Sequence, residues 1–385
     1  MGSGRRKPVT VLAGLTLLAS VMAAGGPAAA AVHHAPPSRG TTPLATKKPQ
    51  ITGLVDMGLQ TYYSENEPFP TVNTAEVAPD AAAFSGIVVN IAWSQLEPTE
   101  NHFAYTALNK SLAAVTTYNQ QHPADPLAVK LRVFGAYAAP QWAKTLDGKP
   151  VTVSGADTDG QWWQPDYRQA WAALQDNLAG HYDTDALVAS VVMDSCASLT
   201  QEPFNMAASA VVLKQIEADG WTDAKQEQCL EGAFADYSAW KHTPVDYAFN
   251  PFKYVKPGAD KFTSNTTITN TVMTECAQSQ ASGGPLCILG NHALDPDAAD
   301  PALSDSDVYR EIDTLYARNP MNTPVDFQAK SPSEGCGAIA LGVSHHGQSA
   351  ELWPPGPSWK GYSAYPEATL EKWDNALKDA TPLSC

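Results

Sequence analysis

The sequence has few basic residues, and they form no basic stripe. Its 385 residues include 24 Lys and Arg against 40 Asp and Glu, a formal net charge of −16. The missing basic stripe argues against nucleic acid as a partner. No glycine-rich fingerprint follows the first predicted strand, which argues against a dinucleotide-binding fold. The cysteines lack the CxxC spacing of zinc sites, so no metal is predicted, and no cofactor is implied.

A long apolar run is also missing. The longest, VTVLAGLTLLASVMAA, has 16 residues, short of the roughly 20 that span a bilayer. Basic residues precede it at Arg5, Arg6 and Lys7, and small residues follow it up to Ala31, which is the pattern of a cleaved secretory signal. We expect a signal peptide over 1–31, a disordered Pro-, Thr- and Ser-rich linker over 32–49, and one domain over 50–385. The mature chain is then secreted (extracellular), without stable membrane association.

All the cysteines follow the expected signal: Cys196, Cys229, Cys276, Cys287, Cys336 and Cys385. An even count in an exported protein predicts three disulfides. Six cysteines allow about 15 connectivities, among which the sequence does not choose. Our working hypothesis is Cys196–Cys229, Cys276–Cys287 and Cys336–Cys385.

Short apolar runs alternate with amphipathic stretches from residue 51 onward. Eight runs are predicted as strands, at 51–63, 84–96, 127–140, 186–195, 245–255, 285–294, 323–329 and 348–354. Helices are predicted at 102–121, 165–182, 231–242, 306–319 and 365–380. Alternating strands and helices indicate an α/β fold with a parallel sheet, and eight units favour a single (β/α)8 TIM barrel with disulfide-stabilised loops. An open, doubly wound sheet is the alternative.

The ends of the predicted strands carry aromatic, amide and carboxyl side chains. In a barrel the functional residues lie at these carboxyl-terminal ends. Aromatic faces stack on sugar rings while amides and carboxylates bind hydroxyls, so the pattern points to a carbohydrate. The candidate substrate-binding residues are Tyr63, Trp93, Trp142, Gln201, Asn291, His292, Gln328 and Trp353.

Three segments resemble a known family. IAWSQLEPTENHFAYTALNKSLAAV, VFGAYAAPQWA and the stretch ending in SCASLTQEPF are similar, in order, to the second, third and fourth units of retaining (β/α)8 glycoside hydrolases (clan A, cellulase/β-galactosidase-like). The resemblance covers about residues 51–380 and is strongest over 84–204. It implies that Glu202 is the general acid/base and that Glu97 belongs to a structural loop.

The sequence departs from that family at two positions. Gln201 stands where the family has Asn before the acid. At the end of the seventh strand, Gln328 replaces the family's nucleophilic Glu, and an amide cannot serve as that nucleophile. Glu351, on the eighth strand, is the candidate in its place, with Asp326 or no nucleophile at all as the alternatives.

Two carboxyl groups that flank a glycosidic bond are the requirement for its hydrolysis. We therefore expect a glycoside hydrolase that cleaves O-glycosidic bonds, with Glu202 and Glu351 as its catalytic residues and a retaining mechanism. A non-catalytic carbohydrate-binding barrel is the alternative, motivated by Gln328, and an inverting enzyme is a third possibility. The sugar, the linkage and the oligomeric state stay open.

Overall fold

The computed structural model describes residues 47–58, 68–199, 202–204, 206–207, 209–256, 259–296, 305–319, 323–331, 334–354, 362 and 365–385. The chain divides at residue 44, and all of these residues belong to the unit Ala45–Cys385. The expected signal peptide lies outside the described residues, so the predicted leader and its cleavage stay predictions. None of the described helices is long and apolar enough to cross a membrane.

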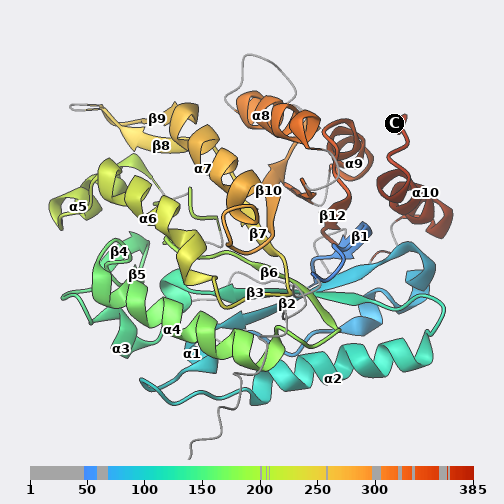
Figure 1. Ribbon diagram of the computed structural model, residues 1–385, viewed down its shortest axis with the longest axis horizontal. Coiled ribbons are helices and arrows are strands. Elements are labelled where there is room, and N and C mark those ends of the chain that lie inside the picture. The colour runs from blue at the N-terminus through green and yellow to red at the C-terminus, as the bar shows by residue number, and fades with distance from the viewer. Residues whose placement is uncertain are drawn as a thin grey trace, which may run out of the picture. The chain divides into compact units, whose positions relative to one another are not determined.

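Eight parallel strands close into a barrel, which confirms the predicted fold (Figure 1). Each strand pairs with the next one of the barrel along the chain, and the last pairs with the first. Each of the eight predicted strands contains one barrel strand or overlaps it. The strands are β1 (Gly53–Asp56), β2 (Gly86–Ala92), β3 (Ala128–Phe134), β6 (Val188–Val192), β7 (Val245–Ala248), β10 (Cys287–Leu294), β11 (Val325–Ala329) and β12 (Ser349–Leu352).

Helices surround the barrel (Figure 1). They are α1 (Trp93–Leu96), α2 (Thr106–Gln121), α3 (Gln141–Lys144), α4 (Pro165–Tyr182), α5 (Ala210–Ala218), α6 (Asp223–Asp236), α7 (Thr266–Ser279), α8 (Asp305–Arg318), α9 (Gly335–Ser344) and α10 (Glu367–Lys378). Short 3-10 helices are η1 (Thr74–Glu76), η2 (Ala78–Ala83) and η3 (Ala136–Ala138). Two hairpins, β4–β5 (Val151–Ser154, Asp157–Asp159) and β8–β9 (Phe252–Val255, Phe262–Asn265), extend from the loops.

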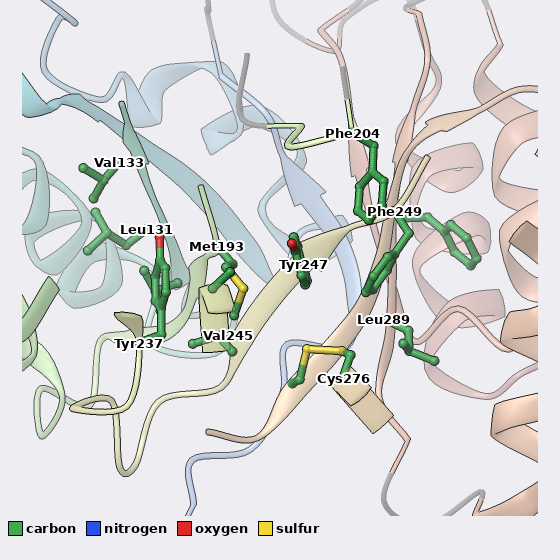
Figure 2. Packing of buried hydrophobic residues seen from close by; sticks show 14 of the residues in the cluster. Leu131, Val133, Met193, Phe204, Tyr237, Val245, Tyr247, Phe249, Cys276 and Leu289 are labelled. Atoms are coloured by element: carbon green, nitrogen blue, oxygen red, sulfur yellow. A yellow bond between two sulfur atoms is a disulfide. The ribbon is translucent and has the colours of Figure 1, made fainter. Parts of the chain in front are cut away.

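Side chains alternate along each strand between the helical layer and the barrel interior, because strand residues have a period of two. On β3, Leu131 and Val133 join the apolar layer beneath the helices, together with Val245 and Tyr247 of β7 and Leu289 of β10 (Figure 2). The intervening positions of the same strands face inward, and several of them carry charge. The outer layer therefore holds the fold together while the interior is free to be polar.

Six of the strands end earlier than the sequence indicates; β1 ends at Asp56, β2 at Ala92, β3 at Phe134 and β12 at Leu352, and the fourth and fifth strands also end early. The fourth was expected to reach Ser195, but β6 ends at Val192, and Glu202 follows only after residues 193–201. The fifth was expected to reach Val255, but β7 ends at Ala248, and the remainder forms β8 of a separate hairpin. Residues 193–195 and 249–252 stay buried beyond these two strands, so a run of buried apolar residues does not mark where a strand ends.

Three disulfides join neighbouring elements, and their pairing is the one taken as the working hypothesis. Cys196, in the loop after β6, is bonded to Cys229 of α6. Cys276 of α7 is bonded to Cys287 of β10, and Cys336 of α9 to Cys385. Each bond restricts the unfolded chain and so stabilises the fold.

Lys48, near the end of the expected linker, already contacts the barrel unit. Its Nζ donates hydrogen bonds to the carbonyl oxygens of Asp185 at 2.6 Å and Val188 at 2.7 Å, and to Thr243 Oγ1 at 2.8 Å. The segment just before residue 50 is therefore fixed at the amino-terminal end of β6.

Candidate active site

Lys130 of β3 is the centre of a buried ion cluster inside the barrel. Its Nζ contacts carboxylate oxygens of Asp246 on β7, Asp326 on β11 and Glu351 on β12, the last at 2.6 Å. An ammonium group has three N–H donors, and here each carboxylate receives one contact. Ser349 adds a hydrogen bond to Asp326. A single lysine thus joins four strands of the barrel.

Arg132, two residues further along β3, lies against the same Glu351. Its Nη2 donates to Glu351 Oε1 at 2.6 Å and Oε2 at 2.7 Å, and lies 3.4 Å from Gln328 Oε1. The side chains of Arg132 and Glu351 are both fully buried. Gln328 and Glu351 are register partners on the adjacent strands β11 and β12, so the Arg132 side chain lies close to both of them.

The cluster sets the charge of its carboxyl groups. Burial alone would raise the pKa of Glu351, but Arg132 and then Lys130 outweigh burial and lower it to about 2. The pKa of Asp246 is likewise lowered, since Lys130 outweighs the effect of burial. Burial, with the charges of Asp246 and Glu351, raises the pKa of Asp326 to about 7 although Lys130 opposes the rise. Glu351 is therefore held as a carboxylate, whereas Asp326 binds its proton more tightly than an ordinary aspartate does.

Four side chains of this cluster have the types that ligate metals. Atoms of Asp246, His292, Asp326 and Glu351 lie within 4.8 Å of one another, all buried. Lys130 contacts three of these carboxylates, and the same carboxylates raise its pKa above the ordinary value although burial opposes them. The ammonium group of Lys130 therefore takes the place among these carboxylates that a metal cation would occupy.

Glu202, the expected proton donor, lies half-buried in the loop after β6. Gln226 of α6 fixes this loop, because its Nε2 donates at 3.0 Å to the carbonyl oxygens of both Cys196 and Pro203. Phe204, which directly follows Pro203, is fully buried, and its ring packs against that of Phe249. The loop that carries Glu202 is thus held by a disulfide, an amide and an aromatic contact. Gln201 and Tyr63 lie outside the described residues.

Trp93, which begins α1 directly after β2, lies against Trp142 of α3, in the segment that follows β3. Trp93 Nε1 donates to Glu97 Oε2 at 3.0 Å, and Trp142 Nε1 donates to the Glu97 carbonyl oxygen at 3.0 Å. Their rings meet edge to face, with centroids 5.7 Å apart. Glu97 also accepts from the Asn101 backbone at 2.8 Å, which confirms its expected part as a structural loop residue. Trp93 is completely buried, whereas part of Trp142 stays exposed.

The remaining candidates divide between the two faces of the strands. Asn291 shares the outward face of β10 with Leu289, where its Nδ2 donates to the Phe249 carbonyl oxygen at 2.7 Å. His292 and Gln328 point inward, and Gln328 Nε2 donates to the His292 carbonyl oxygen at 3.3 Å. Trp353 follows β12, is half-buried, and donates to the Ala329 carbonyl oxygen at 2.7 Å.

The sequence interpretation missed Lys130, Arg132 and Asp246. A signal was present in LAVKLRVFGAY, where two basic residues alternate with apolar ones inside a predicted strand. Since alternate residues face the same side, both had to face the interior and meet acidic partners there. Asp246 in VDYAF shows the same pattern.

Neither a scan against protein-family models nor a search of curated proteins finds a match. Solved structures do match. An endo-glycoceramidase II from Rhodococcus sp., in a cellobiose-like isofagomine complex, has a TM-score of 0.50 at 13% identity over 84% of this chain and 78% of that one. An endogalactoceramidase gives 0.46 at 17% identity, over 86% and 74% of the chains. A β-glycosidase gives 0.48 at 11% identity, over 87% and 98%.

The likeness to the Rhodococcus enzyme shows a shared fold. The closed barrel of this chain is therefore the (β/α)8 fold of glycoside hydrolase structures, as the sequence resemblance implied. At 13% identity the likeness says nothing of the chemistry of individual residues.

Proposed function

We propose that the chain is a secreted glycoside hydrolase that cleaves O-glycosidic bonds with two carboxyl groups, Glu202 and Glu351. The observation that carries the proposal is the state of Glu351. Arg132 and Lys130 hold it as an anion near the carboxyl-terminal end of β12, which is the end of a (β/α)8 barrel where chemistry takes place. Three disulfides accord with export to an oxidising compartment.

In this mechanism the two carboxyl groups have different tasks. Glu202, on the loop after β6, donates a proton to the glycosidic oxygen as the bond breaks. Glu351 stabilises or attacks the positively charged anomeric carbon that develops. Attack would form a glycosyl-enzyme that water then hydrolyses, with Glu202 as base and with net retention of configuration. Trp353, two residues after Glu351 in the chain, would stack against the sugar ring.

The experiment compares E202Q and E351Q with the wild-type protein on a panel of nitrophenyl glycosides. Both variants are expected to lose at least about 100-fold in kcat, since general acid catalysis alone contributes 10²–10⁴-fold. E367Q, on the exposed surface of α10, is the matched control and keeps full activity. Proton NMR of the first-formed anomer tests retention. Full activity of E202Q in a folded protein refutes the proposal.

A second candidate, a barrel that binds carbohydrate without cleaving it, is favoured by a specific observation. Glu351 has no exposed side-chain surface, and both of its oxygens already contact Arg132. Gln328, on the neighbouring strand, is an amide. Under this candidate the wild-type protein binds glycosides in calorimetry, while no reducing sugar is released from any of them.

A further inference from the structure

Several polar atoms inside the barrel are buried without a partner among the described residues. They belong to side chains from four strands: Asn90 Oδ1 on β2, Arg132 Nε and Nη1 on β3, Asp246 Oδ1 on β7, and the Nδ1 ring nitrogen of His292 on β10. Arg132, Asp246 and His292 are at least nine-tenths buried. Buried polar groups in folded proteins are nearly always hydrogen-bonded, so such a concentration at one place indicates that a ligand completes the bonds.

Asn90 and Arg132 are neighbours in this set. They are register partners on adjacent parallel strands, so their side chains leave the same face side by side. Arg132 uses only Nη2 for Glu351 and Gln328, which leaves the Nε and Nη1 donors for a ligand. Asn90 offers its acceptor oxygen. A set of donors and an acceptor therefore enter the barrel interior from adjacent strands.

This mixture of donors and acceptors selects the chemistry of the ligand. A carboxylate only accepts hydrogen bonds and an ammonium group only donates them, so neither suits both Arg132 and Asn90. A hydroxyl group both donates and accepts. Adjacent hydroxyls, which every unsubstituted sugar ring carries, suit the pair.

The charge of the cluster excludes an anionic sugar. Lys130 and Arg132 face the carboxyl groups of Asp246, Asp326 and Glu351, so both cations are already paired with carboxyl groups of the chain. A uronate would add a further negative charge without a free cation to balance it, and burying an unpaired charge is unfavourable. The ligand that fits is uncharged.

A cavity next to Asn90 provides room for a ring. It has a volume of about 140 Å³, and its lining includes Asn90 and Val88 of β2 and Phe69. The Phe69 ring packs against Phe134 of β3, with centroids 4.6 Å apart, so it is held in place. An aromatic and aliphatic wall suits the apolar face of a sugar ring.

We propose that Asn90 and Arg132 form a subsite for an uncharged sugar residue and bind two of its adjacent hydroxyls. The subsite rests on the proposed function for its place in catalysis, but its binding of sugar can be measured without turnover. It assigns the substrate to neutral glycosides and excludes uronides.

Ligand-observed NMR and calorimetry test the subsite with the methyl β-glycosides of glucose, galactose and mannose, each beside its uronate. At least one neutral glycoside is expected to bind about tenfold more tightly than its uronate. N90A is expected to weaken that binding about tenfold, the loss of one net hydrogen bond. Should N90A fail to fold, N90L keeps the side-chain volume and is expected to show the same loss.

The matched control is Q120A. Gln120 lines a groove next to the amino-terminal end of β3, at the opposite end of the barrel, and this variant is expected to bind as the wild-type protein does. Unchanged binding by both Asn90 variants, tighter binding of a uronate, or failure of all three neutral glycosides to bind overturns the subsite. Sugar release assayed in parallel separates the two proposals. Weakened binding without any product keeps the subsite and rejects the hydrolase, whereas hydrolysis with unchanged N90A binding does the reverse.

Discussion

Arg132 Nη2 lies 2.6 and 2.7 Å from the two carboxylate oxygens of Glu351, in a pair from which solvent is fully excluded. The pair connects β3 with β12 across the barrel interior. Each of these ions is the main partner of the other. Removing one of them therefore leaves the other as a buried charge without its main partner. The pair also holds the carboxylate to which the proposed mechanism assigns the attack.

Breaking this pair is expected to destabilise the fold. R132M should lower the free energy of unfolding by about 3–5 kcal/mol, the usual effect of removing one partner of a buried pair. The double variant R132M/E351Q should lose less than the sum of the two single variants, because no unpaired charge remains. Urea unfolding measures all three. K214M removes the exposed pair of Lys214 with Asp260 and should change stability by about 1 kcal/mol or less. Additive losses in the double variant would contradict the coupling.

Gly290 of β10 makes room for the cluster. A Cβ at this position would lie 2.3 Å from Asp246 Oδ1, so G290A displaces the carboxylate from Lys130. We expect a loss of about 1–3 kcal/mol, typical of overpacking. G180A, on α4, is the matched control, since its Cβ meets nothing within 4 Å and alanine favours a helix by up to about 1 kcal/mol. Thermal unfolding compares the two variants, and equal effects would show that the space next to Asp246 is unimportant.

The titration of the Asp56 carboxyl group is expected to contribute to the pH dependence of the free energy of unfolding. Burial raises the pKa of Asp56 to about 7, although a hydrogen bond from Tyr362 at 2.6 Å opposes the rise. The folded state therefore binds this proton more tightly than the unfolded chain does. The contribution of this proton to the free energy of unfolding is complete below about pH 3.8, the ordinary pKa of an aspartate. It is lost as the pH rises through 7, and its amplitude is at most about 4 kcal/mol.

The variant D56N tests this window. Its side chain does not titrate, so the difference in unfolding free energy between wild-type and D56N should move in favour of D56N from pH 4 to pH 8. Chemical unfolding at each pH measures the difference. A difference that stays constant over this range would show that Asp56 titrates normally in the folded protein.

The disulfides should differ in their contributions. Cys336–Cys385 closes a loop of 49 residues and Cys276–Cys287 one of 11. The chain-entropy relation gives stabilisations of about 4 and about 3 kcal/mol. Double serine variants of each pair, compared by urea unfolding, should follow this order. A larger loss at Cys276–Cys287 would show that local packing between α7 and β10 outweighs loop length.

Much of the fold could be predicted because buried parallel strands read as continuous apolar runs. The helix at 165–182 was also clear, since Pro165 occupies the first helical position and apolar residues follow with helical spacing. The end of β6 could not be predicted. Met193 and Ala197 are as buried as the strand before them. An apolar residue predicts burial, but it does not predict whether the backbone is still a strand.

The candidate site was harder to predict because its contacts join distant parts of the chain. Glu351 was chosen as a carboxylate near a strand end, but nothing near it in the sequence names Arg132 and Lys130 as its partners. Those contacts depend on the closure of the barrel and on the register of β3, β11 and β12. The side chain of Asn291 faces the helical layer. The sequence alone cannot distinguish such a residue from its inward-facing neighbours, because it does not show which alternate positions of the strand face the interior.

The ion pairs of Lys130 affect how the strands of the barrel unfold locally. Its ammonium group links β3 to β7, β11 and β12, so none of these strands can leave the barrel without exposing or stranding a buried charge. Local fraying of a single strand is thereby suppressed. Backbone amides of the four strands should exchange with deuterium together, with nearly the same opening free energy, as one cooperative unit.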